Sequence, residues 1–322
     1  MEREWDGGRP VDVIGTLGVL RRGTGDPAHR VDSPTDEDGG PPTDGGVARG
    51  DVARGGGTFW WACATPAGAG TLALSAIGSL VTTRAWGAGA SWLLDRAPLL
   101  LGEGDDWSEL DLSAQPRLAD VARRHQGIRL PSTGVVLDSL VPAVLEQRVT
   151  GGEAHTAWRG LLRRFGQRAP GPRTDLWVPP GPTELLAVPT WDWHRLGVDA
   201  RRQRAIRAAA TVAARLEQCV SLTPDAALAR LQVVPGVGQW TAAETAQRAL
   251  GHPDAVSVGD YHLADLVVHF FTGRARGTDT EMLDLLAPWA GQRQRIVRLI
   301  ELSGVRKPKF GPRYAPVDIR RL

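Results

Sequence analysis

Residues 231–260, LQVVPGVGQWTAAETAQRALGHPDAVSVGD, predict two helices joined by a tight turn and then a carboxylate that opens a third helix. Thr223 as N-cap and Pro224 as first helical residue favour a helix from about Pro224 to Val233. Pro235 ends it because proline has no amide hydrogen and disfavours helical geometry at the preceding residue. A second helix is expected over 239–250, where several alanines permit close packing and Gly251 is a plausible terminator.

The turn at Pro235–Gly238 is a candidate phosphate-binding turn. Gly236 and Gly238 tolerate positive φ and carry no side chain, so the amides of 236–239 can point outward together. The second helix adds its dipole and its free first-turn amides behind the same spot. A glycine-rich turn in an ordinary helical hairpin is the alternative. The flanking Leu231, the Trp-Thr-Ala after the turn and the later Asp260 favour phosphate binding.

The pattern LxxxPGVGxWTA, followed from Val256 by VSVGDYHL, resembles the helix-hairpin-helix DNA glycosylases, and most closely their DNA-3-methyladenine glycosylase II (AlkA-like) branch. The resemblance extends upstream through GIRLPSTGVVLDSLVPAVLEQRVT (127–150) and downstream through APWAGQRQRIVRLI (287–300). It implies an α+β protein: a mainly α-helical glycosylase core, preceded by an antiparallel β/α domain whose fold resembles half of TATA-binding protein.

The chain is therefore expected to form two domains, an N-terminal α+β domain over 1–112 and a helical glycosylase domain over 113–322 with its hairpin at 224–250. In the first domain, 11–20, 58–65 and 71–86 read as strands and 89–94 as a helix. In the second, helices are expected at 118–125, 133–150, 153–165, 183–188 and 199–220. An insertion at about 31–57 is rich in Gly, Pro and Asp and is expected to be disordered. Deleting residues 33–55 should leave activity intact.

Cysteine content and charge restrict the function. Cys63 and Cys219 are the two cysteines of the chain, so an iron-sulfur cluster with four thiolates is excluded. Residues 1–120 hold 10 arginines against 18 Asp and Glu, whereas residues 121–322 hold 28 Lys and Arg against 18. The basic half contains the hairpin and is nearly all arginine, which suits phosphate contact. No run approaches a membrane span and the acidic start lacks a signal peptide's features, so we expect a cytoplasmic protein, nucleoid-associated when bound to DNA.

Asp260 is the candidate catalytic residue. Breaking an N-glycosidic bond develops positive charge on the sugar, which a fixed carboxylate stabilises. In AlkA-like proteins the aspartate at this position is catalytic, and VGDYHL matches that pattern. The alternative is that Asp260 only caps a helix beginning at Tyr261. Asp254 and Asp265 are expected to be surface charges, and His262 is given no role.

Trp240 decides the type of glycosylase. Bifunctional relatives place a lysine after the second hairpin glycine, whose amine attacks the sugar and permits strand cleavage. Here the residue is Trp240, and the two lysines of the chain, Lys307 and Lys309, lie far along the sequence. A water-dependent, monofunctional enzyme that leaves an abasic site is expected.

The base pocket is expected to contain Trp240, Glu244 and Trp289. A purine alkylated at N3 or N7 is cationic and can be selected by stacking on the indole of Trp240. Trp289 matches a second aromatic position of the family's pocket, although core packing explains it equally well. Glu244 departs from the best-known relative, which is aromatic there. Its carboxylate either attracts a cationic base or faces solvent.

DNA contacts are expected from the hairpin and from arginines. The resemblance places Arg148 near the wedge that fills the gap left by a flipped base; a phosphate contact or a solvated charge is the alternative, and the neighbouring Gln147 is taken as structural. The expected DNA-binding set is Pro235, Gly236, Val237, Gly238, Gln239, Thr241 and Arg148. Further phosphate contacts are expected from Arg201, Arg202, Arg204, Arg207, Arg293, Arg295 and Arg298, although such runs are often solvated faces. The family also implies a monovalent cation at the carbonyls of Val234 and Val237.

The sequence thus predicts a monomeric, monofunctional glycosylase that excises alkylated purines of the 3-methyladenine and 7-methylguanine type from duplex DNA in base excision repair. One alternative is a helix-hairpin-helix protein that binds DNA without catalysis. Another is a glycosylase for a different damaged purine such as hypoxanthine.

Overall fold

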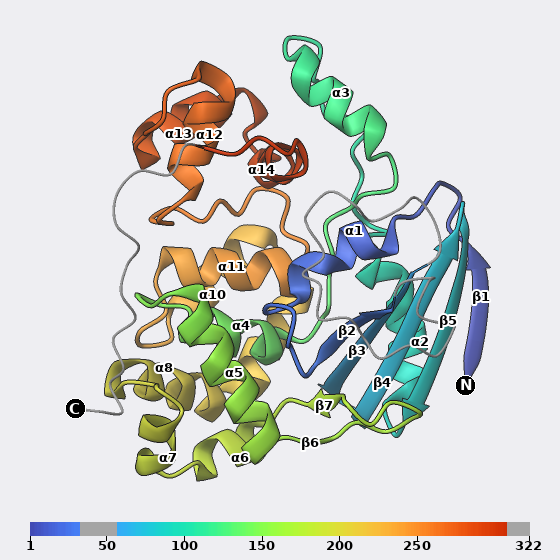
Figure 1. Cartoon of the computed structure of the whole chain (residues 1–322), viewed down its shortest axis with the longest axis vertical. Helices are drawn as coiled ribbons and strands as arrows, with labels where there is room; N and C mark the ends of the chain where they lie inside the picture. The colour runs from blue at the N-terminus through green and yellow to red at the C-terminus, as the bar shows by residue number, and fades with distance from the viewer. Residues whose placement is uncertain (33–56, 308–322) are drawn as a thin grey trace.

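The structure, a computed structural model, describes residues 1–32 and 57–307. The expected insertion lies largely outside these residues, and so does Lys309. The first part of the described chain forms a five-stranded antiparallel sheet in the order β1-β5-β4-β3-β2 (Figure 1). Its strands are β1 (Glu2–Asp6), β2 (His29–Asp32), β3 (Thr58–Thr65), β4 (Gly68–Ile77) and β5 (Leu80–Gly87), accompanied by helices α1 (Val13–Leu17) and α2 (Ala90–Leu100).

The strands expected at 58–65 and 71–86 are confirmed, but residues 11–20 form a helix instead of a strand. The side chain of Asp12 accepts a hydrogen bond from the amide of Gly15 and thereby caps α1. Val13, Leu17 and Leu20 are buried at helical spacing in the sheet's core. Local capping and this spacing overrode the β-propensity of the valines and isoleucine.

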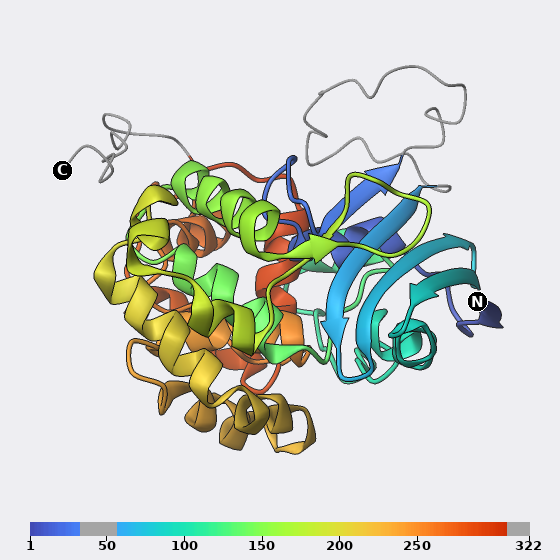
Figure 2. The same cartoon turned by 90° about the horizontal axis from the view of Figure 1, so that it is seen from below.

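The remaining described chain is mainly helical. Its helices are α3 (Pro116–Arg124), α4 (Val136–Leu145), α5 (Gly151–Phe165), α6 (Pro182–Ala187), α7 (Thr190–Arg195), α8 (Ala200–Thr211), α9 (Ala213–Glu217), α10 (Pro224–Gln232), α11 (Gln239–Ala249), α12 (Leu263–Thr272), α13 (Asp279–Leu286) and α14 (Arg293–Leu302). Strands β6 (Gln167–Arg168) and β7 (Trp177–Val178) form a two-stranded ribbon that reaches the large sheet (Figure 2). The expected helix over 199–220 is broken at Val212 between α8 and α9.

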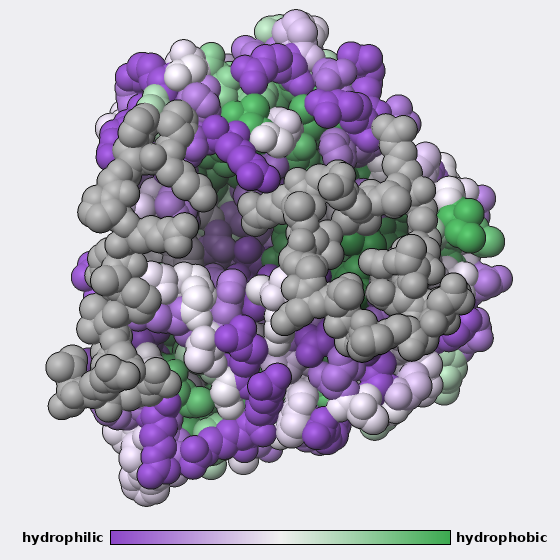
Figure 3. Space-filling view, viewed as in Figure 1, coloured by the Kyte–Doolittle hydropathy of each residue, from purple (hydrophilic) through white to green (hydrophobic). Residues whose placement is uncertain are grey.

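Two hydrophobic clusters in the helical part meet at the loop that carries Asp260. Helices α4, α5, α8, α10 and α11 bury one cluster, in which the alanines of α11 allow close contact with α4. Helices α3, α12, α13 and α14 bury the other. The loop 250–262 leads from α11 in the first cluster to α12 in the second. Figure 3 shows that this face of the molecule is hollowed between the C-terminal helices and the helices below them.

In the described residues, no helix is long and apolar enough to cross a membrane. The expected domain boundary near residue 112 stays a prediction. Leu110 and Leu112, which precede it, pack against the C-terminal cluster.

Candidate active site

The turn between α10 and α11 uses its two glycines differently. Gly236 has φ of +90°, and a Cβ there would lie 2.8 Å from the Cβ of Ala205. Gly238 has φ of −95°, and a Cβ there would meet nothing within 4 Å. Both glycines tolerate a positive φ, and Gly236 adopts one whereas Gly238 does not. Gly238 borders open space, where a ligand can approach the backbone.

The amides of the turn are only partly available. Val237 donates its amide to the carbonyl of Val234 at 3.0 Å and buries its side chain, so its expected outward amide is wrong. The amides of Gly238, Gln239 and Trp240 have no acceptor among the described residues. They lie at the N-terminus of α11, where free amides can bind an anion.

Gln147 holds the turn from the side of α4, in agreement with a structural role. Its Nε2 donates to the carbonyl of Gly236 at 3.0 Å and to Oγ1 of Thr241 at 2.8 Å. Thr241 is 2% exposed and its hydroxyl accepts this hydrogen bond, so a DNA contact from Thr241 stays a prediction. Arg148, next to Gln147, is exposed and adopts φ of +54°, a strained value for arginine. Arg148 lies in the loop between α4 and α5.

Asp260 lies at the start of α12 and within hydrogen-bond distance of Trp240. Its Oδ1 accepts the backbone amides of His262 at 2.7 Å and Leu263 at 2.9 Å. Its Oδ2 accepts the indole N–H of Trp240 at 3.1 Å. The carboxylate therefore caps the helix, which begins at Leu263 and not at Tyr261. It is also half-buried beside an aromatic ring, so capping and a role in chemistry are compatible.

Comparison with solved structures shows which known proteins share the fold of this chain. The chain is similar to solved structures of a 3-methyladenine DNA-glycosylase from Archaeoglobus fulgidus (TM-score 0.73, 14% identity, covering 94% of this chain and 98% of that one). It is also similar to an 8-oxoguanine glycosylase/lyase from Clostridium acetobutylicum bound to DNA (TM-score 0.64, 10% identity, covering 94% and 96%). These similarities show that the chain shares its fold with these glycosylases.

A curated relative from Mycobacterium tuberculosis is a probable bifunctional transcriptional activator/DNA repair enzyme AlkA. It is 34% identical over 161 residues, which cover 47% of this chain and 31% of the relative. The chain thus spans about a third of the length of the curated relative it matches. No family model matches the chain.

Glu244 does not face solvent, contrary to one of the two expectations for it. Its side chain is 13% exposed and its two oxygens bind different partners. Oε1 accepts from the Ser257 hydroxyl at 2.5 Å, and Oε2 accepts from Nη1 of Arg248 at 2.7 Å. Burial alone would raise the pKa of Glu244, but Arg248 and Ser257 hold it below its ordinary value. The carboxylate is ionised at neutral pH and already neutralised by the protein.

Trp289 belongs to the core of the C-terminal helices. It is 8% exposed, its ring stacks on Phe271 with centroids 6.0 Å apart, and its indole N–H donates to the carbonyl of Asp111 at 2.7 Å. The core-packing alternative accounts for these contacts. A pocket role for Trp289 stays a prediction.

Most of the arginines expected to bind phosphate hold the protein together instead. Arg202 is 3% exposed and donates to Asp199 and to the carbonyl of Leu145. Internal acceptors also occupy Arg207 (Leu186 carbonyl), Arg293 (Asp254), Arg295 (Asp105) and Arg298 (Gly15 carbonyl). The phosphate assignment is wrong for these five. Arg201 and Arg204 are exposed on α8 and remain candidates.

Two aspartates expected on the surface are partly buried in ion pairs. Asp254 binds Arg293, with Nε and Oδ1 2.8 Å apart. Asp265 binds Lys307, with Nζ and Oδ2 2.6 Å apart. The second pair brings Lys307 to the first turn of α12, the helix that Asp260 caps. A lysine that appears remote in the sequence is therefore near this helix, although its ammonium is engaged.

Sequence reasoning missed Tyr261. Its ring is 87% exposed directly after Asp260 and meets the ring of His262 edge-on, with centroids 4.8 Å apart. The signal was an aromatic residue next to a candidate catalytic carboxylate.

At the turn between α10 and α11, the Val237 carbonyl has no donor among the described residues, and the Val234 carbonyl accepts one amide. Free lone pairs on both oxygens fit the monovalent cation that the family implies.

Proposed function

We propose that the protein is a monofunctional glycosylase that excises alkylated purines from duplex DNA. The hydrogen bond between Trp240 and Asp260 carries the proposal, because it joins an aromatic ring suited to stacking with a carboxylate suited to stabilising a cationic sugar. The similarity to AlkA and to 3-methyladenine glycosylases supports alkylated bases as the substrate.

The chemistry needs no group beyond these residues and water. The flipped purine stacks on Trp240 and leaves with the electrons of its N-glycosidic bond. The Asp260 carboxylate stabilises the positive charge that develops on the sugar. Water then attacks the anomeric carbon, and its proton passes to Asp260 or to solvent. The products are the free base and an abasic site.

DNA binding is assigned to the outward amides at the start of α11. They cradle a phosphate near Gly238, while Arg201 and Arg204 add positive charge on α8. The helix dipole of α11 favours the same anion. We expect the protein to act as a monomer.

Base release and strand cleavage separate this function from its alternatives. Duplex DNA methylated with dimethyl sulfate should lose 3-methyladenine or 7-methylguanine to the protein, and its backbone should stay intact until alkali or heat is applied. Release with immediate strand breaks would contradict the monofunctional assignment, and Lys307→Ala would show whether Lys307 is responsible. Binding without release of alkylated, deaminated or oxidised bases would identify a catalytically silent protein.

A further inference from the structure

Helix α11 presents one polar stripe to the loop 250–262. Trp240, Glu244 and Gln247 follow one another at helical spacing, so they lie on the same face of the helix. Each of them makes a hydrogen bond to the loop or to Asp260 at its end. The stripe therefore has several attachment points along the segment that carries the proposed catalytic residue.

Ser257 is the central attachment point of the loop. It is 3% exposed, and its hydroxyl donates to Oε1 of Glu244 at 2.5 Å and accepts from Nε2 of Gln247 at 2.9 Å. The same Nε2 donates to the carbonyl of Ala255 at 2.8 Å. The carbonyl of Ser257 in turn accepts the amide of Asp260 at 3.1 Å. The position of Asp260 thus depends on the position of Ser257.

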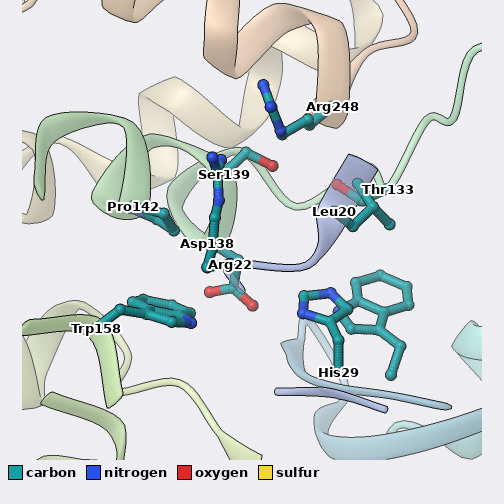
Figure 4. A pocket seen from close by; sticks show the side chains of 10 residues that line it. Leu20, Arg22, His29, Thr133, Asp138, Ser139, Pro142, Trp158 and Arg248 are labelled. Carbon is teal, nitrogen blue, oxygen red and sulfur yellow. The ribbon is translucent and has the colours of Figure 1, made fainter. Parts of the chain in front are cut away.

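The other oxygen of Glu244 connects the stripe to the N-terminal part of the chain. Arg248 donates from Nη1 to Glu244 and from Nε to the carbonyl of Val19 at 3.1 Å. Arg248 also lines a small cavity together with Leu20 and Arg22 of the N-terminal part (Figure 4). A continuous series of contacts therefore runs from Val19 through Arg248, Glu244 and Ser257 to the backbone of Asp260.

Both carboxylate oxygens of Glu244 are engaged inside the protein. One of its oxygens is engaged by a hydroxyl, the other by a guanidinium, and Arg248 neutralises its charge. We infer that Glu244 is a positioning residue that holds the Asp260 loop through Ser257 and ties it to the N-terminal part through Arg248. The kinetic consequence of this inference rests on the proposed glycosylase function.

Substitutions at Glu244 and Ser257 test the inference through a rate measured at saturating enzyme. Glu244→Leu should lower single-turnover release of 7-methylguanine by about tenfold or more, because small displacements of a catalytic group cost large factors in rate. The Kd for the DNA should stay near the wild-type value. Glu244→Gln keeps one acceptor for Ser257, so its rate of release should lie between those of Glu244→Leu and the wild type. Ser257→Ala should slow release, and adding it to Glu244→Leu should cost little more, because both variants remove the hydrogen bond between Ser257 and Glu244.

Asp192→Asn is the matched control. Asp192 is a buried carboxylate on α7, away from the C-terminal helices, and it pairs with Arg195 of the same helix and with Arg164 of α5. It should lower stability without changing the rate of the folded enzyme. Equal rates for Glu244→Leu and the wild type would overturn the inference, and so would a loss in Asp192→Asn as large as in Glu244→Leu.

Amide hydrogen exchange tests the positioning role without any catalysis. Residues 255–263 should exchange faster in Glu244→Leu than in the wild type or Asp192→Asn, while the second half of α12 stays protected. Unchanged exchange over 255–263 would overturn the inference. A wild-type protein that releases no base would overturn the proposed function alone, and the exchange result would then decide the positioning role.

Discussion

The carboxyl group of Asp138 lies against a cavity of about 20 Å³ between the N-terminal sheet and α4. Figure 4 shows it among Arg22, His29 and Trp158, and its Oδ2 has no hydrogen-bond partner among residues 1–32 and 57–307. Burial raises the pKa of Asp138 to about 8, and the Glu217 carboxylate contributes in the same direction. The folded protein therefore holds this proton to a much higher pH than the unfolded chain does.

This proton makes stability depend on pH. The unfolded chain releases it near the ordinary value of 3.8, and the folded protein near 8. The stabilisation is therefore complete below the lower value and is lost as pH rises through the interval. Asp138→Asn should remove this dependence. The urea midpoint of the variant should therefore rise relative to the wild-type midpoint as pH increases from 5 to 8. Parallel curves for the two proteins over that range would contradict the assignment.

Residues beside the site differ in how far the sequence could reveal their roles. Asp260 and Trp240 could be found because the turn before them carries strong local signals in proline and glycine. Arg248 stands four residues after Glu244, the spacing of a helical ion pair. Ser257 could not be found as its second partner, because Ser257 lies beyond the end of α11 and the path of the loop brings the two side chains together. The prediction of phosphate contacts from the arginines failed for a similar reason. A run of charged residues in the sequence does not show which of them are buried or which carbonyls they bind.

The hairpin turn offers a direct comparison of two glycines. Gly236→Ala places a side chain at positive φ and against Ala205, so it should lower the free energy of unfolding by about 1–3 kcal/mol. Gly238→Ala places its Cβ in open space at an ordinary φ, so it should lower the free energy of unfolding by clearly less. Urea unfolding of both variants measures the difference. Equal losses would show that the turn does not have this geometry.

Elements with local signals were predictable, and those shaped by distant contacts were not. Strands β3, β4 and β5 and the hairpin helices follow from patterning and from turn residues. The start of α4 depends on Glu217 of α9, whose carboxylate accepts the amides of Val136 and Leu137 at 2.8 and 2.9 Å. The break at Val212 lets α9 take its own direction and present Glu217 there. No local pattern announces such a long-range cap.

The two parts of the chain are joined by buried polar contacts as well as by apolar packing. Arg22 donates to both oxygens of Glu146, and the indole of Trp158 donates to Asp26 at 2.9 Å. Arg248 adds its bond to Val19 next to the proposed catalytic loop. Removing one partner from such buried pairs is costly, because the other charge is left unpaired. The segment 19–26, between α1 and β2, therefore supports the geometry of the helical part.

The central claim is that Asp260 performs the chemistry on a base flipped beside Trp240. Single-turnover release of 7-methylguanine by Asp260→Asn tests it most directly, because asparagine keeps the acceptor for the α12 amides and loses the charge. The rate should fall by about a hundredfold or more with the Kd for DNA preserved, while Asp265→Asn, which alters a nearby paired carboxylate, should stay close to wild type. Release by Asp260→Asn at the wild-type rate would contradict the claim.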